Sequence, residues 1–181
     1  MLAKFLRMKT IKDYITTIPD FPKKGIMFRD ITTLINDADG FKLAIDKMCD
    51  LVKDLDYDVI ACAEARGFIF GAPMAYNNHK PLVLIRKKGK LPGKTISQSY
   101  DLEYGSAEIS MHTDSFKPGS RVLIVDDLLA TGGTTEAMIK LVEKLGGVVV
   151  GVCVLIELPT LGGREKIKGY RIDSAVAFDG E

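Results

Sequence analysis

The chain has 181 residues, 46% of them hydrophobic, which predicts one compact domain with a proper core. Its 25 basic and 24 acidic residues nearly cancel, so composition gives no general attraction to nucleic acid or to a membrane surface. We expect a single domain over residues 1–181, because no repeat, low-complexity tract or linker divides the chain.

The cysteines indicate the compartment. Cys49, Cys62 and Cys153 are widely spaced within apolar sequence, and an odd count without a C-x-x-C pair favours reduced, buried thiols. Neither His79 nor His112 lies near a cysteine, which disfavours a zinc cluster. The apolar stretch at the start is too short for a signal peptide, and nothing later approaches a membrane span. We therefore predict a cytoplasmic protein.

The first clear element is a helix that follows Asp39, its predicted N-cap, because apolar residues recur from there at three- and four-residue steps. This stripe is interpreted as core. A short apolar strand is predicted over residues 58–65, a second buried helix over residues 67–77, and another strand over residues 81–87.

The second half of the chain begins with a polar segment at residues 88–114, whose alternating pattern predicts an exposed hairpin or a long mobile loop. A buried strand follows over residues 121–127, then a helix that closes at Gly146 and Gly147, then a long strand over residues 148–158. Continuous apolar strands that alternate with helices predict an α/β fold, with a central, mostly parallel sheet flanked by helices.

The stretch VLIVDDLLATGGTT, at residues 122–135, ends a buried strand with two adjacent carboxylates and then opens into a loop of Gly and Thr. Residues 130–134 lead into a helix, so their backbone N–H groups can converge on an anion at the positive end of the helix dipole. Asp126 and Asp127 would repel a phosphate, whereas carboxylates accept hydrogen bonds from vicinal sugar hydroxyls. The stretch therefore predicts a ribose 5-phosphate cradle at the carboxyl edge of the sheet.

Two other interpretations apply to the glycine-rich segments. An N-cap followed by a glycine-rich turn would explain any three residues of the loop, but not two carboxylates at the end of a buried strand. GKLPGKT, at residues 89–95, looks like a P-loop, but three residues instead of four separate its glycines and a strand-like segment follows. A solvated loop is the ordinary alternative for its basic run. We interpret that run as a local cluster that can neutralise a pyrophosphate: Arg86, Lys87, Lys88, Lys90 and Lys94.

VLIVDDLLATGGT closely resembles the phosphoribosyl pyrophosphate (PRPP) motif of type I phosphoribosyltransferases. Within that superfamily the chain is similar to the adenine phosphoribosyltransferases, through FPKKGIMFRDIT, EARGF, RKKGKLPGKT and SYDLEYG. The resemblance implies the type I phosphoribosyltransferase fold, with a small N-terminal hood from about residues 10–36 and a flexible catalytic loop at about residues 88–106. It also implies transfer of the 5-phosphoribosyl group from PRPP to N9 of adenine, which gives AMP and pyrophosphate in purine salvage.

The resemblance also implies roles for single residues around PRPP. Asp126 and Asp127 would bind the ribose. The residues expected at the 5-phosphate are Ala130, Thr131, Gly132, Gly133 and Thr134. Those expected at the pyrophosphate are Ala65, Arg66, Arg86, Lys87 and Lys90. In the family, the turn that contains Ala65 often has a non-proline cis peptide. The resemblance also implies that Arg86 reaches the neighbouring subunit of the family's homodimer.

For the base, the resemblance implies that Phe28 stacks on the purine and Leu158 closes its other face, while ordinary core or hinge positions are the alternative for both. Backbone groups around Met27 and Arg29 would read the edge of adenine, because its amine needs an acceptor and N1 needs a donor. A 6-oxo purine presents the reverse polarity.

The resemblance implies three catalytic residues. Arg66 and Lys87 would stabilise the departing pyrophosphate together with Mg2+, and Glu103 would act as the acid or base for the adenine proton. We expect the metal to be held mainly by PRPP and water, without a direct protein ligand. A closing loop would exclude water from PRPP.

Three rival functions remain open. Another purine phosphoribosyltransferase, for xanthine or for hypoxanthine and guanine, would share the ribose cradle. A PRPP-binding regulator would need an added DNA-binding domain or a strongly basic face. A P-loop kinase is disfavoured by the glycine spacing.

Overall fold

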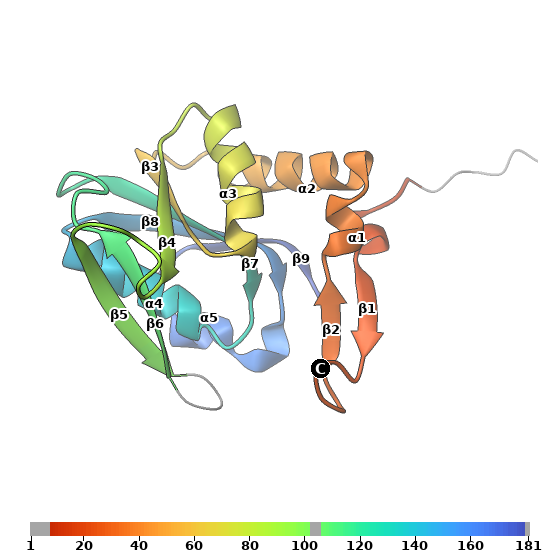
Figure 1. The fold of residues 1–181 in the computed structure, drawn as a ribbon. Coiled ribbons are helices and arrows are strands. Elements are labelled where there is room, and N and C mark those ends of the chain that lie inside the picture. Colours follow the sequence, from red (N-terminus) through yellow and green to blue (C-terminus); the bar gives the residue numbers. More distant parts are fainter. Residues whose placement is uncertain (1–7, 102–105, 180–181) are drawn as a thin grey trace, which may run out of the picture.

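A seven-stranded sheet with the order β5-β6-β4-β3-β7-β8-β9 forms the centre of the fold (Figure 1). The computed structural model describes residues 8–101 and 106–179. From β4 to β9 in this order, neighbouring strands are parallel, whereas β5 and β6 pair antiparallel and β6 joins β4 in the same way. The strands are β3 (Val59–Ala63), β4 (Leu82–Lys87), β5 (Thr95–Asp101), β6 (Ser106–His112), β7 (Arg121–Leu129), β8 (Val148–Glu157) and β9 (Ile172–Ala177).

Helices cover both faces of this sheet. In Figure 1, α2 (Ala38–Leu51) and α3 (Arg66–Asn77) lie above it and α4 (Gly133–Lys144) lies below. The side chains of β7 alternate accordingly, since Leu123 packs in the cluster with α2 and α3, whereas Ile124 packs in the cluster with α4. The predicted α/β fold with a mostly parallel, doubly covered sheet is confirmed.

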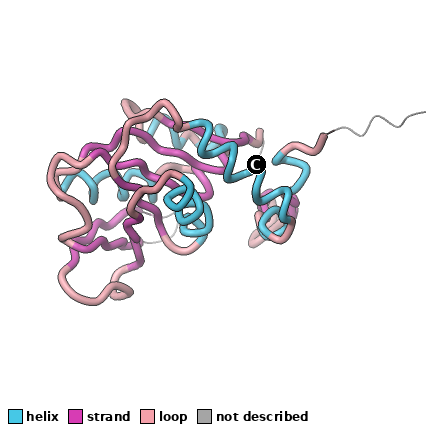
Figure 2. The backbone as a smooth tube through the Cα atoms, turned by 90° about the horizontal axis from the view of Figure 1, so that it is seen from above, coloured by secondary structure: helices cyan, strands magenta, loops and turns pink. Residues whose placement is uncertain are grey.

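The segment expected to form the hood is a small unit beside this sheet (Figure 2). Its strands β1 (Thr16–Pro19) and β2 (Met27–Asp30) pair antiparallel, and the short helices η1 (Ile11–Tyr14) and α1 (Thr32–Ile35) flank them. Tyr14 packs against Gly40 at the start of α2, where an added Cβ would lie 2.6 Å from the ring. The close contact between Tyr14 and Gly40 fastens the hairpin to the larger layer.

Most predicted elements are present, with two corrections. The helix α2 has Asp37 as its N-cap instead of Asp39, because Asp37 has an extended backbone and its carboxylate accepts hydrogen bonds from the N–H groups of Asp39 and Gly40. The strand β7 continues to Leu129, beyond its predicted end at Asp127, so the two aspartates lie within the strand and not at its last position.

The polar segment predicted as a hairpin forms β5 and β6, but one face of β6 is buried, since Ile109 and Met111 enter the core beside β4. Of the expected catalytic loop, residues 95–101 form β5, and residues 102–105 lie outside the described residues. Closure of that loop stays a prediction. The sequence patterns did not predict β9, η2 (Pro159–Leu161) or α5 (Gly163–Lys166). Within the described residues, no helix has the length and apolar character needed to cross a membrane.

Candidate active site

The two aspartates of β7 are buried at the carboxyl end of the parallel strands. Asp126 is 8% exposed and Asp127 is 7% exposed, and the N–H of Asp127 donates to Oδ1 of Asp126 at 2.9 Å. The first turn of α3 passes directly beside them, because a Cβ added to Gly67 would lie 2.8 Å from Oδ1 of Asp126. A glycine is required there for the helix to begin so close to the acid.

Burial makes both carboxylates hard to ionise. It raises the pKa of Asp126 well above the ordinary value, and the negative charge of Asp127 raises it further. Burial also raises the pKa of Asp127, although the charge of Arg66 opposes this. A pair of buried acids that is costly to charge is suited to accept hydrogen bonds from neutral hydroxyl groups.

The glycine-rich loop at residues 130–134 joins β7 to α4. Gly132 has φ +82°, which favours glycine, and a Cβ there would lie 2.8 Å from the carbonyl oxygen of Gly163. Because α4 begins at Gly133, the N–H groups of its first turn have no partners within the helix and can serve an anion. Thr131 is exposed and Thr134 is half-buried, so neither residue is shut off from a ligand.

Arg66 opens α3 and faces the aspartates. Its Nε lies 2.8 Å from Oδ2 of Asp127, and its guanidinium carbon lies 6.0 Å from the ring centroid of Phe28. The peptide bond between Glu64 and Ala65 that precedes it is cis, as in the turn described for the family. Arg66 thereby lies between the acids and the hood.

These segments enclose a cavity of about 260 Å³. Among its lining residues are most of those predicted to bind PRPP: Ala65, Arg66, Asp126, Asp127, Ala130, Thr131, Gly132, Gly133 and Thr134. Sequence reasoning missed Tyr100 and Thr135, which also line it. Tyr100 lies in the quoted SYDLEYG motif, whereas Thr135 had no signal beyond its place after the loop.

The predicted pyrophosphate residues of β4 lie outside this lining. Arg86 directs its guanidinium to the carboxylate of Glu64, with contacts of 3.0 and 3.3 Å, and donates to the carbonyl of Lys90 at 3.2 Å. The N–H of Lys87 donates to the same carboxylate at 2.5 Å, while the side chains of Lys87 and Lys90 are exposed. A role for Arg86 in a neighbouring subunit stays a prediction.

The carboxylate of Glu64 binds both Arg86 and the N–H of Lys87 at the end of β4, and the sequence analysis did not identify it as a site residue. Burial would raise its pKa, but the N–H of Lys87 and the guanidinium of Arg86 outweigh that effect and lower it. Glu64 is therefore an ionised anchor for the end of β4. The predicted catalytic carboxylate, Glu103, lies outside the described residues.

A second, smaller cavity of about 110 Å³ lies between the hood and the sheet. It brings together all the predicted adenine-binding residues, from opposite ends of the chain, with further apolar side chains: Ile26, Met27, Phe28, Arg29, Leu128, Ile156 and Leu158. The side chain of Arg29 donates to Thr17 at 2.5 Å and lies over the ring of Phe178. Arg66, Asp127 and Leu128 line both cavities, which therefore adjoin.

The aromatic contact between Phe28 and Phe21 was also not predicted. Phe21 meets Phe28 in an edge-to-face contact with centroids 5.1 Å apart, so a second aromatic residue of the hood holds the predicted stacking residue.

Comparison with known proteins agrees with this geometry. Residues 35–180 match the phosphoribosyl transferase domain family. The chain is 61% identical over 174 residues to an adenine phosphoribosyltransferase of Agathobacter rectalis, which covers 96% of this chain and 100% of that protein. The crystal structure of adenine phosphoribosyltransferase from Thermoanaerobacter pseudethanolicus has a TM-score of 0.90 at 50% identity, covering 93% of this chain and 98% of that one.

A more distant structure, the adenine phosphoribosyltransferase of Saccharomyces cerevisiae complexed with an imino-altritol bisphosphate and adenine, has a TM-score of 0.86 at 32% identity. The match covers 92% of this chain and 96% of that one. The sequence resemblance is thus confirmed, and the chain belongs to the adenine phosphoribosyltransferases, within the phosphoribosyl transferase domain family.

Proposed function

We propose that the chain transfers the 5-phosphoribosyl group from PRPP to N9 of adenine, which forms AMP and pyrophosphate for purine salvage. The observation that carries this proposal is that the two cavities adjoin at Arg66, Asp127 and Leu128. One cavity offers the donors and acceptors of a phosphorylated sugar, and the other offers the apolar walls of a planar base. A ribose in the first would meet a base in the second at this junction.

The larger cavity is assigned to PRPP. Asp126 and Asp127 accept hydrogen bonds from the ribose hydroxyls, and the loop at residues 130–134 donates its N–H groups to the 5-phosphate at the start of α4. Ala65 and Arg66 bind the pyrophosphate, with Lys87, Lys90 and Arg86 at its outer side. Ala65 and Arg66 line the cavity, which supports their role. The local basic charge supports the role of the three residues at the outer side.

The smaller cavity is assigned to adenine. Phe28 stacks on one face of the base and Leu158 covers the other, while backbone groups near Met27 and Arg29 pair with its edge. Adenine needs an acceptor for its amine and a donor for N1, and a 6-oxo purine would leave such groups unpaired, at a cost of several orders of magnitude in specificity.

The reaction depends on managing charge at the junction. As the bond from ribose C1 to pyrophosphate breaks, negative charge grows on the leaving group, where Arg66 and Lys87 stabilise it. Glu103 takes the adenine proton. Mg2+ would be held mainly by PRPP and water, because this ion usually keeps several waters and substrate oxygens as ligands and needs few protein ligands. Asp126 and Asp127 are assigned to the ribose hydroxyls and not to the metal. When bound, Mg2+ would supply further charge neutralisation at the pyrophosphate.

We extend the proposal to assembly and compartment. The homodimer is implied by the family resemblance, and the exposed side chains of Tyr76 on α3 and Leu84 on β4 are available to such a contact. Three free cysteines support a reducing compartment such as the cytoplasm.

The test is pyrophosphate release from PRPP and Mg2+ with adenine, hypoxanthine, guanine or xanthine supplied one at a time, with each product identified by mass. We expect AMP from adenine and no product from the 6-oxo purines. Activity only with a 6-oxo purine would overturn the base assignment, and PRPP binding without transfer would favour a regulator.

A further inference from the structure

We propose that Glu157 and Arg164 are positioning residues that hold the 5-phosphate loop and the wall of the base cavity in register with each other. This inference rests on the proposed function and adds an ion pair that none of the sequence motifs contains. Neither residue lines the two cavities, so any effect on substrates passes through their neighbours.

The ion pair is well formed and partly buried. Glu157, at the end of β8, is 5% exposed, and Arg164, in α5, reaches both of its carboxylate oxygens with Nε at 2.5 Å and an Nη at 2.7 Å. The hydroxyl of Ser174 donates to the same carboxylate at 2.8 Å, and Arg164 also donates to the carbonyl of Ile172 at 3.1 Å. Bidentate geometry with additional hydrogen bonds fixes both the position and the direction of Arg164.

The residue before Arg164 touches the phosphate loop directly. Gly163 is buried, and a Cβ on it would lie 2.4 Å from the carbonyl oxygen of Ala130 and 3.0 Å from Leu129. From the other side, a Cβ on Gly132 would lie 2.8 Å from the carbonyl oxygen of Gly163. The two backbones are therefore in contact without intervening side chains, and a shift of Gly163 would displace the loop.

The residue after Glu157 forms the wall of the base cavity. Leu158 lines that cavity, and its N–H donates to the carbonyl of Leu129 at 2.9 Å. The segment from Glu157 to Arg164 thus leaves β8, passes the base cavity and returns to the phosphate loop. The ion pair joins the first and last residues of this segment to each other.

The consequence is that one ion pair supports two subsites. When it is lost, the loop and Leu158 are free to move relative to Asp126 and Asp127, which remain fixed in β7. Small misplacements of binding groups weaken substrate alignment strongly, on the order of tenfold to a hundredfold for about 1 Å.

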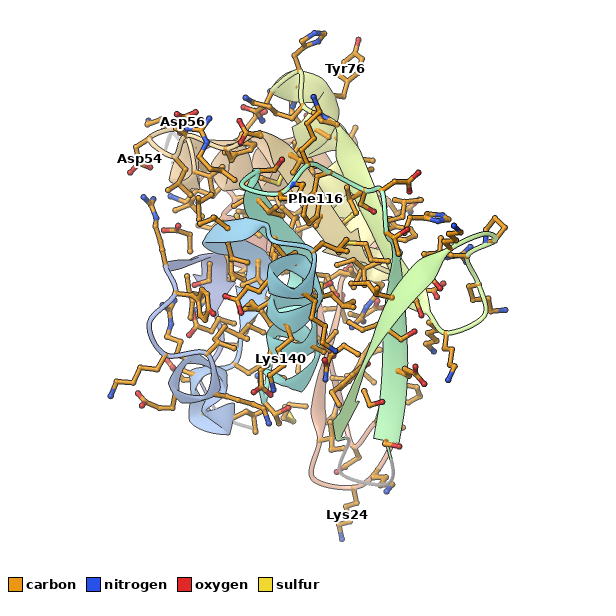
Figure 3. The ribbon with its side chains drawn as sticks, turned by 90° about the vertical axis from the view of Figure 1, so that its left-hand side faces the viewer. Lys24, Asp54, Asp56, Tyr76, Phe116 and Lys140 are labelled. Carbon is orange, nitrogen blue, oxygen red and sulfur yellow. The ribbon has the colours of Figure 1, made fainter. Side chains whose placement is uncertain are left out.

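The first experiment compares Arg164→Ala with Arg171→Ala. Arg171 is a matched control, because it pairs with Asp54 at 2.6 Å and with Asp173 at 2.7 Å and also joins two elements. Asp54, the partner of Arg171, lies at the opposite end of the molecule from Lys24 at the tip of the hood (Figure 3), so the control ion pair is remote from that tip. We expect Arg164→Ala to raise the KM values for PRPP and adenine by roughly tenfold or more, with a smaller effect on kcat. Arg171→Ala should lower thermal stability and leave both KM values within about twofold.

Two further variants separate positioning from folding. Arg164→Ala leaves Glu157 buried without its partner and could unfold the chain, so the double variant Glu157→Gln with Arg164→Gln, which buries no unpaired charge, is tested beside it. Arg164→Lys should restore part of the affinity, because it keeps the charge but not the bidentate geometry. Unchanged KM values in the folded double variant would overturn the proposal.

A binding measurement distinguishes this proposal from the proposed function. Protection against thermal unfolding by ribose 5-phosphate needs the loop but no transfer chemistry. We expect protection in the unmodified protein and in Arg171→Ala, and a clear loss in the double variant. If the unmodified protein binds ribose 5-phosphate but makes no AMP, the proposed function fails, and this comparison still decides the role of the ion pair. Equal protection in all variants, or none in the unmodified protein, would overturn the positioning role.

Discussion

Arg66 and Asp127 form an ion pair, with Nε and Oδ2 2.8 Å apart, at the junction of the two cavities. Each residue has a separate proposed partner in PRPP, since Asp127 is assigned to the ribose and Arg66 to the pyrophosphate. The pair therefore keeps two substrate-binding groups satisfied before the substrate arrives. On the proposed assignments, binding of PRPP would exchange this contact for two contacts with the substrate, and Asp127 is the most direct position to test.

Asp127→Asn should weaken PRPP binding. An amide can still accept a hydrogen bond from one ribose hydroxyl, but it loses the charge-assisted bond and its pairing with Arg66. We expect the KM for PRPP to rise roughly tenfold to a hundredfold, as removal of a hydrogen bond to a charged group implies. Steady-state pyrophosphate release measures this, and an unchanged PRPP affinity would remove Asp127 from the ribose site.

Asp126→Asn should stabilise the substrate-free protein at neutral pH. Burial and then the charge of Asp127 raise the pKa of Asp126 in the folded chain above 3.8, so the folded state holds this proton more tightly than the unfolded state. The stability from this group is fully present below the unfolded pKa and is lost as pH rises through the folded pKa. The neutral asparagine avoids that loss.

Denaturant unfolding of both proteins across pH checks this expectation. Asp126→Asn should be the more stable protein at neutral pH, and the difference should shrink on acidification toward the unfolded pKa. PRPP binding should weaken in the same variant. Greater stability of the unmodified protein at neutral pH would contradict the electrostatic argument.

Phe28→Leu should weaken adenine binding selectively. Stacking of a base on an aromatic ring contributes roughly 1–3 kcal/mol, so the KM for adenine should rise about tenfold while the KM for PRPP changes little. Phe41→Leu is a matched control, because Phe41 also takes part in an edge-to-face pair, with Phe70 at 6.2 Å, but is half-buried against the core and lines neither cavity. If both variants change the adenine KM equally, Phe28 has no special role at the base.

Glu103→Ala should mainly slow turnover. Positioned acids and bases contribute roughly a hundredfold to ten-thousandfold, so kcat should fall within that range while both KM values change little. Glu108→Ala, in β6, is the control, because Glu108 pairs with Lys88 at 2.8 Å and lines neither cavity. Rapid turnover in Glu103→Ala would show that another group manages the proton.

The sequence by itself determined the central strands β3, β4, β7 and β8 and the arrangement of the predicted PRPP cradle. The buried strands could be predicted because each is a continuous apolar run, and the cradle because Asp126 to Thr134 are contiguous, so a strand, a loop and a helix start suffice to bring them together. The family resemblance added Ala65 and Arg66, which lie at the start of a helix that was also predicted. Local geometry decided these features.

Only the tertiary structure decided what depends on distant parts of the chain. The base cavity needs the hood at Phe28 and the end of β8 at Leu158, and no local pattern encodes their meeting. β9 was missed because its residues are all half-buried, which gives neither a continuous apolar run nor a clear alternation. The bonds of Glu64 to Arg86 and of Glu157 to Arg164 were invisible for a related reason: a charged side chain looks solvated in sequence, and its partner is known only once the strands and helices have packed.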